Sequence, residues 1–394
     1  MMKYKRIFLI VCDSLGIGYD TESIEYNDFG ANTIKHIIEA KNGIKMPNLE
    51  KLGYGNLIEL DYISKTNNKN CFYGILHESS IGKDTLTGHH EMMGIKTLKP
   101  FKTFTDTGFP TELIELLENK TGHKIIGNKK ASGTEIIKEL GMESIKDNKM
   151  IVYTSSDSVL QIAAHEKYFG LEELYRVCHI AREICMDPKY KVARIIARPF
   201  IGDSPNTFTR TPNRHDYALS PNGKTVLDSL KDNGYKVISI GKIKDIFNGC
   251  GITDAIKTIS NDDGMNKNLE LIDKDFTGLV FTNLVDFDSL YGHRRDVFGY
   301  HKAIEEFDIK LGELINKLHD DDLLMITADH GNDPTWHGTD HTREYVPLLI
   351  YNKNLEEGKN LGIRDSFSDI GATIADNFNC NNPGIGKSFI KLLK

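Results

Sequence analysis

Three strongly apolar runs along the chain each end in an acidic residue. Residues 6–13 read RIFLIVCD, residues 278–288 read GLVFTNLVDFD, and residues 322–330 read DLLMITADH. Each run is short, rich in β-branched or aromatic side chains and without helical periodicity, which is typical of a buried strand in a parallel sheet. The pattern therefore predicts three buried strands that end near Asp13, Asp288 and Asp329.

Helical patterns alternate with these strands. They cover residues 224–234, 300–318 and 366–378, and a further strand pattern covers residues 235–241. Such alternation predicts an α/β fold with a central, mostly parallel sheet flanked by helices on both faces. Ligands of such sheets bind beyond the carboxyl ends of the strands, so we expect Asp13, Asp288 and Asp329 to converge there.

The pattern changes between residues 101 and 219. Strand patterns here look amphipathic or antiparallel, helical segments lie between them, and residues 207–223 are rich in turn formers. The alternation of strands and helices resumes at Lys224. We therefore expect an inserted α+β domain of residues 101–219, within a discontinuous core domain of residues 1–100 and 220–394.

Composition narrows the class of protein. Of the 394 residues, 39% are hydrophobic and 27% charged, which suits a soluble globular protein, and the net charge of -7 argues against a nucleic-acid binder. No apolar stretch has the length of a membrane span, and IFLIVC near the start is too short for a signal peptide. Six scattered cysteines favour free thiols in the cytoplasm. Nothing in the sequence indicates an obligate protein partner.

Residues 326–351 concentrate carboxylates and imidazoles. Asp329, His330 and His341 lie there, and Asp288 is followed by His293. Asp and His together suit a divalent ion such as Mn²⁺, Zn²⁺ or Fe²⁺. Six or seven such ligands are too many for one ion with an open position and suit two ions, which can clamp both oxygens of a phosphoryl transfer. Two further acids of the segment, Asp333 and Asp340, are interpreted as turn formers or as residues that support the ligands, and a ligand role of His337 stays open.

A hydroxyl group opens the helical pattern of residues 82–94, GKDTLTGHHEMMG. Thr85 there has two interpretations, a helix N-cap or a nucleophile. A helix start also favours phosphate, because its free N–H groups and its dipole attract anions. A metal centre would activate the hydroxyl, so the two features explain each other.

Together these motifs resemble those of the alkaline phosphatase superfamily, and among its members the phosphopentomutase family. The segments that carry the resemblance are Asp13 with its strand, KDTLTGHHE, DFDSLYGH, TADHGND and GTDHTREYVP. Cofactor-independent phosphoglycerate mutases are related, but they usually carry Ser at the Thr85 position and four-residue spacing where Asp288 and His293 are five apart. His90 departs from the phosphopentomutase pattern, which usually has Trp there.

The resemblance implies an alkaline-phosphatase-like core with an inserted cap that recognises the substrate. It implies that Asp13, Asp329 and His330 hold one Mn²⁺, and that Asp288, His293 and His341 hold another, with other divalent metals able to replace it. Thr85 would be the phosphorylated nucleophile. It also implies that Arg194 and Arg210 contact the phosphate of the substrate. Asp157 has two interpretations, as an acceptor for a ribose hydroxyl or as a turn or cap carboxylate.

The implied reaction interconverts ribose 1-phosphate and ribose 5-phosphate, and their 2-deoxyribose equivalents. It would pass through phosphothreonine and a bisphosphate, with a sugar bisphosphate such as glucose 1,6-bisphosphate as activator. The partners are then small-molecule pentose phosphates, without nucleic acid or membrane. The alternative is another metal-dependent phosphomutase or phosphomonoesterase of the same superfamily.

Overall fold

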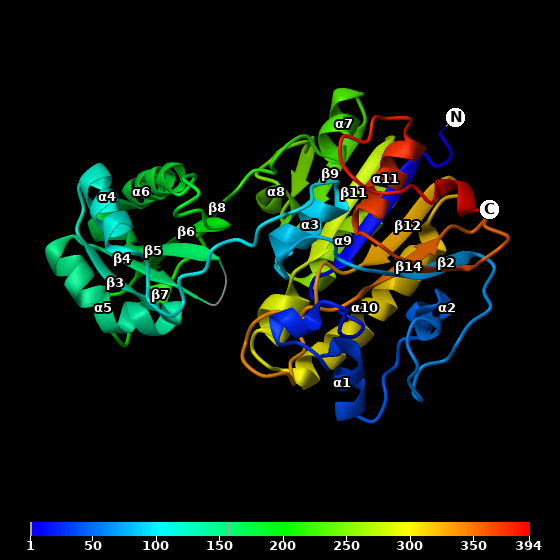
Figure 1. Cartoon of the computed structure of the whole chain (residues 1–394), viewed down its shortest axis with the longest axis horizontal. Helices are drawn as coiled ribbons and strands as arrows, with labels where there is room; N and C mark the ends of the chain where they lie inside the picture. Colours follow the sequence, from blue (N-terminus) through cyan, green and yellow to red (C-terminus); the bar gives the residue numbers. More distant parts are fainter. Residues whose placement is uncertain (1, 156–157) are drawn as a thin grey trace. The chain divides into compact units, whose positions relative to one another are not determined.

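The computed structural model describes residues 2–155 and 158–394. The chain forms two compact units (Figure 1). Residues 1–99 and 220–394 form the core unit, and residues 100–219 form the inserted unit. Within the described residues, no helix has both the length and the apolar character needed to cross a membrane.

The core unit is built on an eight-stranded sheet in the order β10-β9-β11-β1-β12-β13-β2-β14. Neighbouring strands are parallel except at β13, which is antiparallel to both β12 and β2. The expected mostly parallel sheet is therefore confirmed. Its strands are β1 (Arg6–Cys12), β2 (Cys71–Leu76), β9 (Lys236–Ile240), β10 (Asp254–Ile256), β11 (Gly278–Leu284), β12 (Asp322–Thr327), β13 (Val346–Tyr351) and β14 (Asn360–Arg364).

The three strands predicted from the acid-terminated runs lie side by side at the centre of this sheet. β1 pairs with β11 on one side and with β12 on the other, and all three strands are buried at every position. Cys12 lies opposite Leu284, and Val11 lies opposite Thr327. Because the strands are parallel and in register, the acids that follow them meet at one edge, as predicted.

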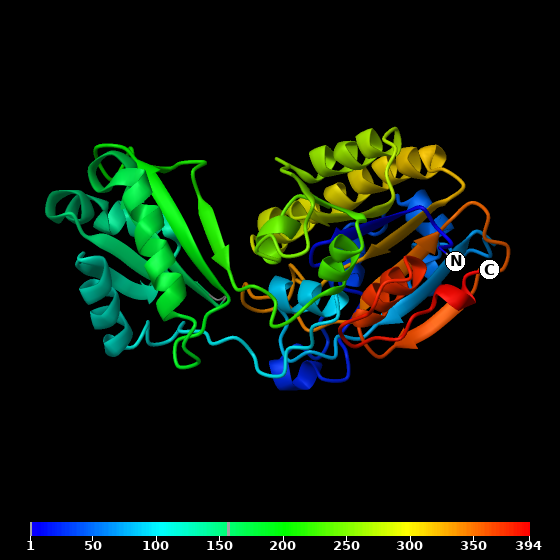
Figure 2. The ribbon, with the colours of Figure 1, turned by 90° about the horizontal axis from the view of Figure 1, so that it is seen from above.

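Helices cover both faces of the sheet. Figure 2 shows α9 and α10 on one side and α3 and α11 on the other. On α10, Ile304, Phe307, Leu311 and Leu314 recur every three or four residues and are all buried, so one stripe of the helix faces the core. The first layer comprises α1 (Thr33–Ala40), α2 (Pro47–Lys51), α9 (Asn261–Ile272) and α10 (Val297–Lys317), which contact one another around α10. The remaining helices are α3 (Thr85–Met92), α7 (Val226–Asp232), α8 (Ile243–Ile246) and α11 (Ser368–Asn377), with short turns η1 (Ser23–Tyr26), η2 (Tyr54–Asn56) and η5 (Ile390–Leu392) and a π-helix η4 (Phe287–Gly292).

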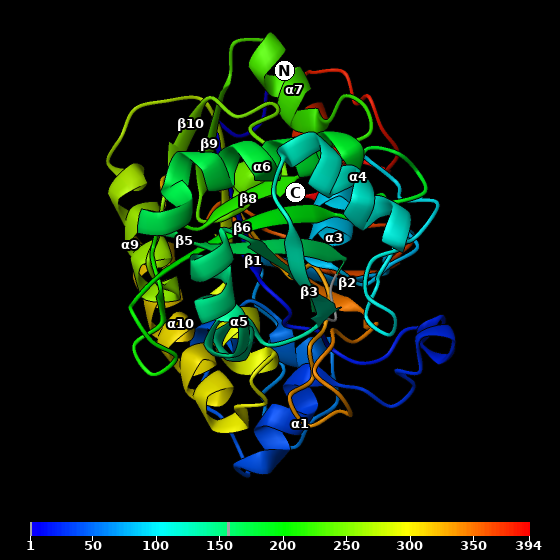
Figure 3. The ribbon, with the colours of Figure 1, turned by 90° about the vertical axis from the view of Figure 1, so that its left-hand side faces the viewer.

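The inserted unit has a sheet in the order β3-β4-β5-β6-β7, with β8 paired to β6. Helices α4 and α6 cover one face and α5 covers the other (Figure 3). The strands are β3 (Ile125–Lys130), β4 (Met150–Thr154), β5 (Val159–His165), β6 (Arg194–Ile201), β7 (Thr209–Arg210) and β8 (His215–Ala218), and the helices are α4 (Thr111–Thr121), α5 (Gly133–Asp147), α6 (Leu171–Ile184) and a π-helix η3 (Glu166–Gly170).

The expectation of amphipathic or antiparallel strands in this unit is only partly correct. β4 and β5 are buried at every position, and the pairs β3–β4 and β5–β6 are parallel. The other pairs, β4–β5, β6–β7 and β6–β8, are antiparallel. Separate apolar clusters lie on the two faces, so the central strands have no solvent side to give them an alternating pattern.

Candidate metal centre

The first group of ligand candidates lies directly after two central strands. Asp13 follows β1, and Asp329 and His330 follow β12. The Nε2 atom of His330 lies 3.5 Å from Oδ1 of Asp13 and 3.3 Å from Oδ2 of Asp329. All three side chains are buried. Parallel pairing of β1 and β12 thus brings together residues that are more than 300 positions apart in the sequence.

The second group comes from the π-helix η4 and from the segment before β13. Asp288 lies within η4, and His293 directly follows it. The Nε2 atoms of His293 and His341 lie 3.2 and 3.4 Å from the two carboxylate oxygens of Asp288, and 3.1 Å from each other. Nitrogen and oxygen atoms from two segments therefore converge on one point.

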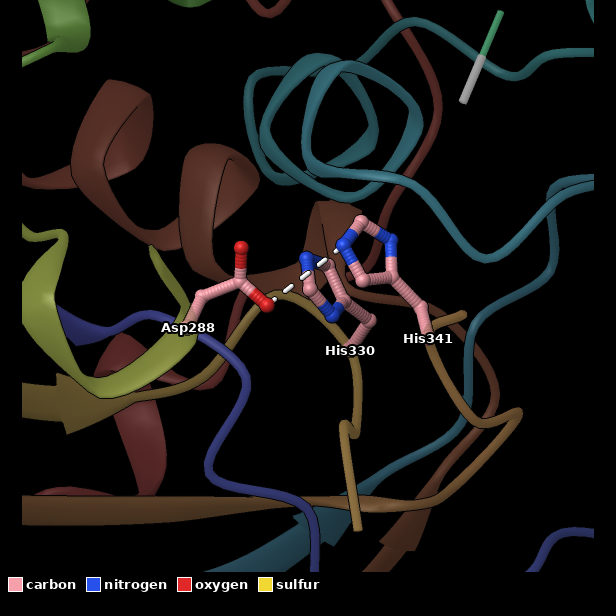
Figure 4. A group of neighbouring side chains, drawn as sticks. All are labelled: Asp288, His330 and His341. Atoms are coloured by element: carbon pink, nitrogen blue, oxygen red, sulfur yellow. Dashed lines mark ion pairs between the residues drawn. The ribbon is translucent and has the colours of Figure 1, made fainter. Parts of the chain in front are cut away.

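The two groups adjoin each other. The rings of His330 and His341 stack with their centroids 3.9 Å apart. Asp288, His330 and His341 each offer one atom within 4.8 Å of the others, as do Asp13, Asp329 and His330. Figure 4 shows the carboxylate of Asp288 directed at the two imidazoles. The six predicted ligands thus form one continuous set of donors.

Backbone carbonyl groups orient the three imidazoles. Nδ1 of His330 lies 3.0 Å from the carbonyl oxygen of Gly331, Nδ1 of His293 lies 2.8 Å from that of Thr339, and Nδ1 of His341 lies 2.9 Å from that of Lys83. A carbonyl oxygen only accepts, so each Nδ1 carries the proton that it donates. This arrangement directs every Nε2 into the site, which is the usual orientation of a metal-binding histidine.

Each of the two strand-end carboxylates has one oxygen in a hydrogen bond and one oxygen that faces the imidazoles of the site. Asp13 Oδ2 accepts from Asn283 Nδ2 at 2.9 Å, and Asp329 Oδ1 accepts from the backbone N–H of Ser14 at 3.0 Å. Asp13 Oδ1 and Asp329 Oδ2 are buried and have no hydrogen-bond partner among the described residues. Unsatisfied buried oxygens cost free energy, so this donor set fits divalent cations.

Electrostatic coupling within the site is strong. Burial, together with repulsion from Asp329 and Asp288, raises the pKa of Asp13 to about 6. Burial also opposes ionisation of Asp329, but His330 and His89 outweigh it and hold the pKa of Asp329 below its usual range. The carboxylates of Asp13, Asp288 and Asp329 therefore repel one another within one buried site, and bound cations would relieve this repulsion.

Thr85 is the first residue of α3, and its neighbour caps the helix. The side chain of Asp84 accepts from the backbone N–H groups of Leu86 and Thr87, both at 3.1 Å. The N-cap interpretation of Thr85 is therefore wrong. Its hydroxyl is instead buried beside the first group of ligands, 3.2 Å from Nε2 of His330.

The glycine of the same helix allows α3 to approach the site closely. A Cβ atom on Gly88 would lie 2.2 Å from the carbonyl oxygen of Asp329. His89 follows with Nδ1 3.2 Å from Oδ2 of Asp329 and 2.9 Å from the carbonyl oxygen of Thr85. His90 points away, with Nε2 3.0 Å from the carbonyl oxygen of Ile246.

Three polar residues of the same segment lie outside both groups. Asp333 pairs with His36 and accepts from the backbone N–H of Asn32, so it stabilises the loop. His337 is exposed and contacts the carbonyl oxygen of Asn27, and Asp340 lies 3.4 Å from Lys83.

In the inserted unit, two predicted substrate ligands lie on one face of the sheet. Side chains alternate along β6, and Phe200 lies opposite Arg210, so Arg194 and Arg210 point to the face that α5 covers. Arg194 Nη1 lies 3.7 Å from Oδ2 of Asp216. Asp157 lies outside the described residues.

Arg210 lies against the N-terminus of α5. A Cβ atom on Gly133, the first residue of that helix, would lie 1.8 Å from Arg210 Nη2 and 2.3 Å from the Tyr153 hydroxyl. Ser132 at the N-cap makes no side-chain capping bond among the described residues, so its side chain does not satisfy the first N–H groups of this 15-residue helix. A guanidinium, a phenol and a helix N-terminus together suit an anion.

Asn283 and Asn332 were not predicted from the sequence. Asn332 Nδ2 donates to Asp288 Oδ1 at 2.7 Å, as Asn283 does to Asp13. Asn283 lies in a strand that is buried at every position. A polar residue within such an apolar run could have indicated a role in the site.

Comparison with known proteins gives a family match over almost the whole chain. The sequence profile described as the Metalloenzyme superfamily matches residues 5–382. The PH0037 protein from Pyrococcus horikoshii has a similar structure, with a TM-score of 0.50 and 16% identity over 96% of this chain and 98% of that one. A phosphoglycerate mutase from Leishmania mexicana has a TM-score of 0.46 and 12% identity over 98% of this chain and 97% of that one. A protein of the alkaline phosphatase superfamily from Vibrio parahaemolyticus has a TM-score of 0.46 and 13% identity over 98% of this chain and 70% of that one.

Proposed function

Because the chain belongs to the Metalloenzyme superfamily, that of alkaline phosphatase, we propose that it is a metal-dependent phosphotransferase with Thr85 as its nucleophile. Within that class, we propose the reaction of a phosphopentomutase, which interconverts ribose 1-phosphate and ribose 5-phosphate. The specific reaction rests on the sequence motifs around Thr85, Asp288 and His341 and on the arginines of the inserted unit.

One observation carries the proposal. The Thr85 hydroxyl is free of capping, lies at the N-terminus of α3, and is 3.2 Å from His330 Nε2. The helix N-terminus attracts phosphate oxygens, and the adjoining ligand set fits two divalent cations, Mn²⁺ foremost. When bound, such cations supply Lewis acidity and lower the pKa of a coordinated hydroxyl.

The residues of this chain then divide the reaction into one priming transfer and two transfers in each turnover. In priming, Thr85 Oγ1 loses its proton and forms a bond to the phosphorus of a sugar bisphosphate. The bond from that phosphorus to the sugar oxygen breaks, and this oxygen takes up a proton, which leaves phosphothreonine and a sugar hydroxyl. A hydroxyl of the incoming pentose phosphate then takes the phosphoryl group, and the bisphosphate so formed returns its other phosphate to Thr85. Glucose 1,6-bisphosphate would prime an unphosphorylated enzyme.

The inserted unit supplies a candidate anion site for the phosphate that is not transferred. Arg210, the Tyr153 hydroxyl and the N-terminus of α5 meet at Gly133. Arg is preferred for phosphate because its planar guanidinium binds two oxygens at once. We propose that Arg194 and Arg210 bind the sugar phosphate and that Asp157 binds a ribose hydroxyl.

A phosphomonoesterase of the same superfamily is the alternative. It would use the same ligand set and Thr85, but water would take the phosphoryl group. The two activities differ in a single product, which is inorganic phosphate.

The test follows ribose 1-phosphate by ³¹P NMR in the presence of Mn²⁺ and a trace of glucose 1,6-bisphosphate. We expect wild type to form ribose 5-phosphate without inorganic phosphate. The rate in Thr85→Ala should be lower by at least about 10³-fold. Thr85→Ser keeps a hydroxyl and should retain measurable activity. Inorganic phosphate as the main product would instead support the phosphomonoesterase, and full activity of Thr85→Ala would exclude this nucleophile.

A further inference from the structure

Arg295 adopts a backbone conformation that is unusual for its residue type. It lies two residues after His293, with a φ of 56°, in the left-handed region. Non-glycine residues there cost of the order of 1 kcal/mol and persist where their surroundings fix them. The hydrogen bonds of the side chain indicate what fixes this one.

The guanidinium of Arg295 makes five hydrogen bonds, all to neutral oxygens. Nε donates to Gly338 O at 2.6 Å, and Nη2 donates to Asp340 O at 3.2 Å. Nη1 donates to Gly292 O at 3.0 Å, to Asn332 Oδ1 at 2.7 Å and to Asp333 O at 3.0 Å. One side chain therefore joins the end of η4 to both ends of the loop of residues 333–340.

One branch of this network leads to Asp288. Because Asn332 Oδ1 accepts from Arg295, the amide is oriented with Nδ2 toward Asp288 Oδ1, to which it donates at 2.7 Å. Asn332 is fully buried, and its backbone N–H donates to Thr33 Oγ1 at 3.1 Å. The Asn332 side chain thus has one orientation that satisfies both of its partners.

The other branch leads to His293. Arg295 binds the carbonyl groups of Gly338 and Asp340, and the carbonyl group between them, that of Thr339, lies 2.8 Å from Nδ1 of His293. The position of this loop therefore decides where the ring of His293 points. Among the described residues, Arg295 alone donates from its side chain to both Gly338 O and Asp340 O.

We propose that Arg295 is the positioning residue of the second metal site, acting on Asp288 through Asn332 and on His293 through the loop carbonyl of Thr339. The inference rests on the proposed ligand role of Asp288, His293 and His341. Partners that orient metal ligands typically contribute 10- to 100-fold to metal affinity.

The test is a Mn²⁺ titration of the metal-free protein by calorimetry and by EPR, in wild type and in Arg295→Gly. Glycine accepts the left-handed backbone, so this variant removes the side chain without adding strain. We expect two ions in wild type, and in the variant a loss of about 10- to 100-fold in affinity for one ion alone. Arg294→Gly is the matched control, because Arg294 is exposed and adjacent; it should bind both ions as wild type does.

Thermal unfolding of the metal-free proteins separates positioning from a general effect on the fold. Unchanged affinity for both ions in Arg295→Gly would overturn the proposal, as would an equal loss for both ions together with a large fall in the unfolding temperature. Arg295→Lys, which can reach only part of the five acceptors, should give an intermediate affinity. If wild type itself bound no second ion, the proposed function would fail rather than this inference alone.

Discussion

At the scale of single residues, two carboxylate oxygens of the candidate metal centre make no hydrogen bond in the part of the chain that the structure describes, which lowers the stability of the metal-free fold and favours binding of a cation. Asp13 Oδ1 and Asp329 Oδ2 are buried and make no hydrogen bond among the described residues; each lies near the Nε2 atom of His330, at 3.5 and 3.3 Å. A fold selected only for stability would satisfy or remove such atoms. Their free energy is recovered when a cation binds the folded protein and not the unfolded chain.

Asp13→Asn should therefore change stability in opposite directions with and without metal. Burial and repulsion raise the pKa of Asp13 to about 6, so ionisation of this carboxyl disfavours the folded state. The cost begins above the pKa of the unfolded chain, about 3.9, and is complete above about pH 6, where it is at most about 3 kcal/mol. Without metal at pH 7.5, the Asn variant should unfold at a higher temperature than wild type. With Mn²⁺ the order should reverse. Thermal unfolding with EDTA and with Mn²⁺ measures both, and the same order in both conditions would contradict the prediction.

His90 gives a second prediction about single residues. Burial lowers the pKa of His90 to about 4, so the folded protein keeps it neutral while the unfolded chain binds a proton below about 6.5. The stability that the neutral ring contributes is complete above pH 6.5 and is lost as pH falls toward 4, by at most about 3 kcal/mol. His90→Gln can still donate to the carbonyl group of Ile246 but does not titrate.

Urea unfolding at pH 7 and pH 5 checks this. The free energy of unfolding should fall less between these pH values in His90→Gln than in wild type. His337→Gln, at an exposed position, is the control. An equal fall in wild type and His90→Gln would show that the buried ring is not the acid-sensitive group.

At the scale of elements, the N-terminus of α5 carries a prediction about substrate binding. Gly133→Ala would place a methyl group where Arg210 and the Tyr153 hydroxyl now lie, so both must move. We expect KM for ribose 5-phosphate to rise about tenfold, corresponding to about 1.4 kcal/mol, with unchanged metal content. Thr134→Ala, one position along the same helix and exposed, is the control. Unchanged KM in Gly133→Ala would remove this helix end from the substrate site.

The elements of the core unit could be predicted because their signals are local. β1, β11 and β12 are continuous apolar runs, and α10 repeats its apolar residues with helical spacing. The direction of β13 could not be predicted, because an apolar run carries no record of which strands it will lie between. The burial of β4 and β5 was missed for a related reason, since it depends on α5 covering the second face.

Residues of the candidate site could be predicted where their type and their position at the end of a strand were informative. A carboxylate directly after a buried strand is informative, which identified Asp13 and Asp329. Asn332 and Arg295 act through contacts with residues distant in sequence, and neither type is unusual in a loop. Thr85 was ambiguous because Asp84 and Thr85 can both cap a helix, and only the hydrogen bonds of Asp84 decide between them.

At the scale of the whole molecule, the inserted unit has what an independent domain needs. Its sheet has an apolar cluster on each face, drawn from residues 109–208. Compact units with their own core generally fold alone. We therefore expect residues 100–219, produced as a separate protein, to unfold in one cooperative transition and to give a dispersed NMR spectrum. A fragment without cooperative unfolding would show that its stability depends on the core unit.

The capping of α3 by Asp84 has a consequence for repeated turnover. The Thr85 hydroxyl, which would carry the phosphoryl group, does not cap the helix, because the side chain of Asp84 already accepts from the N–H groups of Leu86 and Thr87. Esterifying Thr85 therefore removes no bond on which the first turn depends. The first turn of α3 would therefore stay intact when Thr85 is phosphorylated. The phosphorylated and unphosphorylated forms of the enzyme would then have the same backbone structure at this helix, and only the group on Thr85 would differ between them.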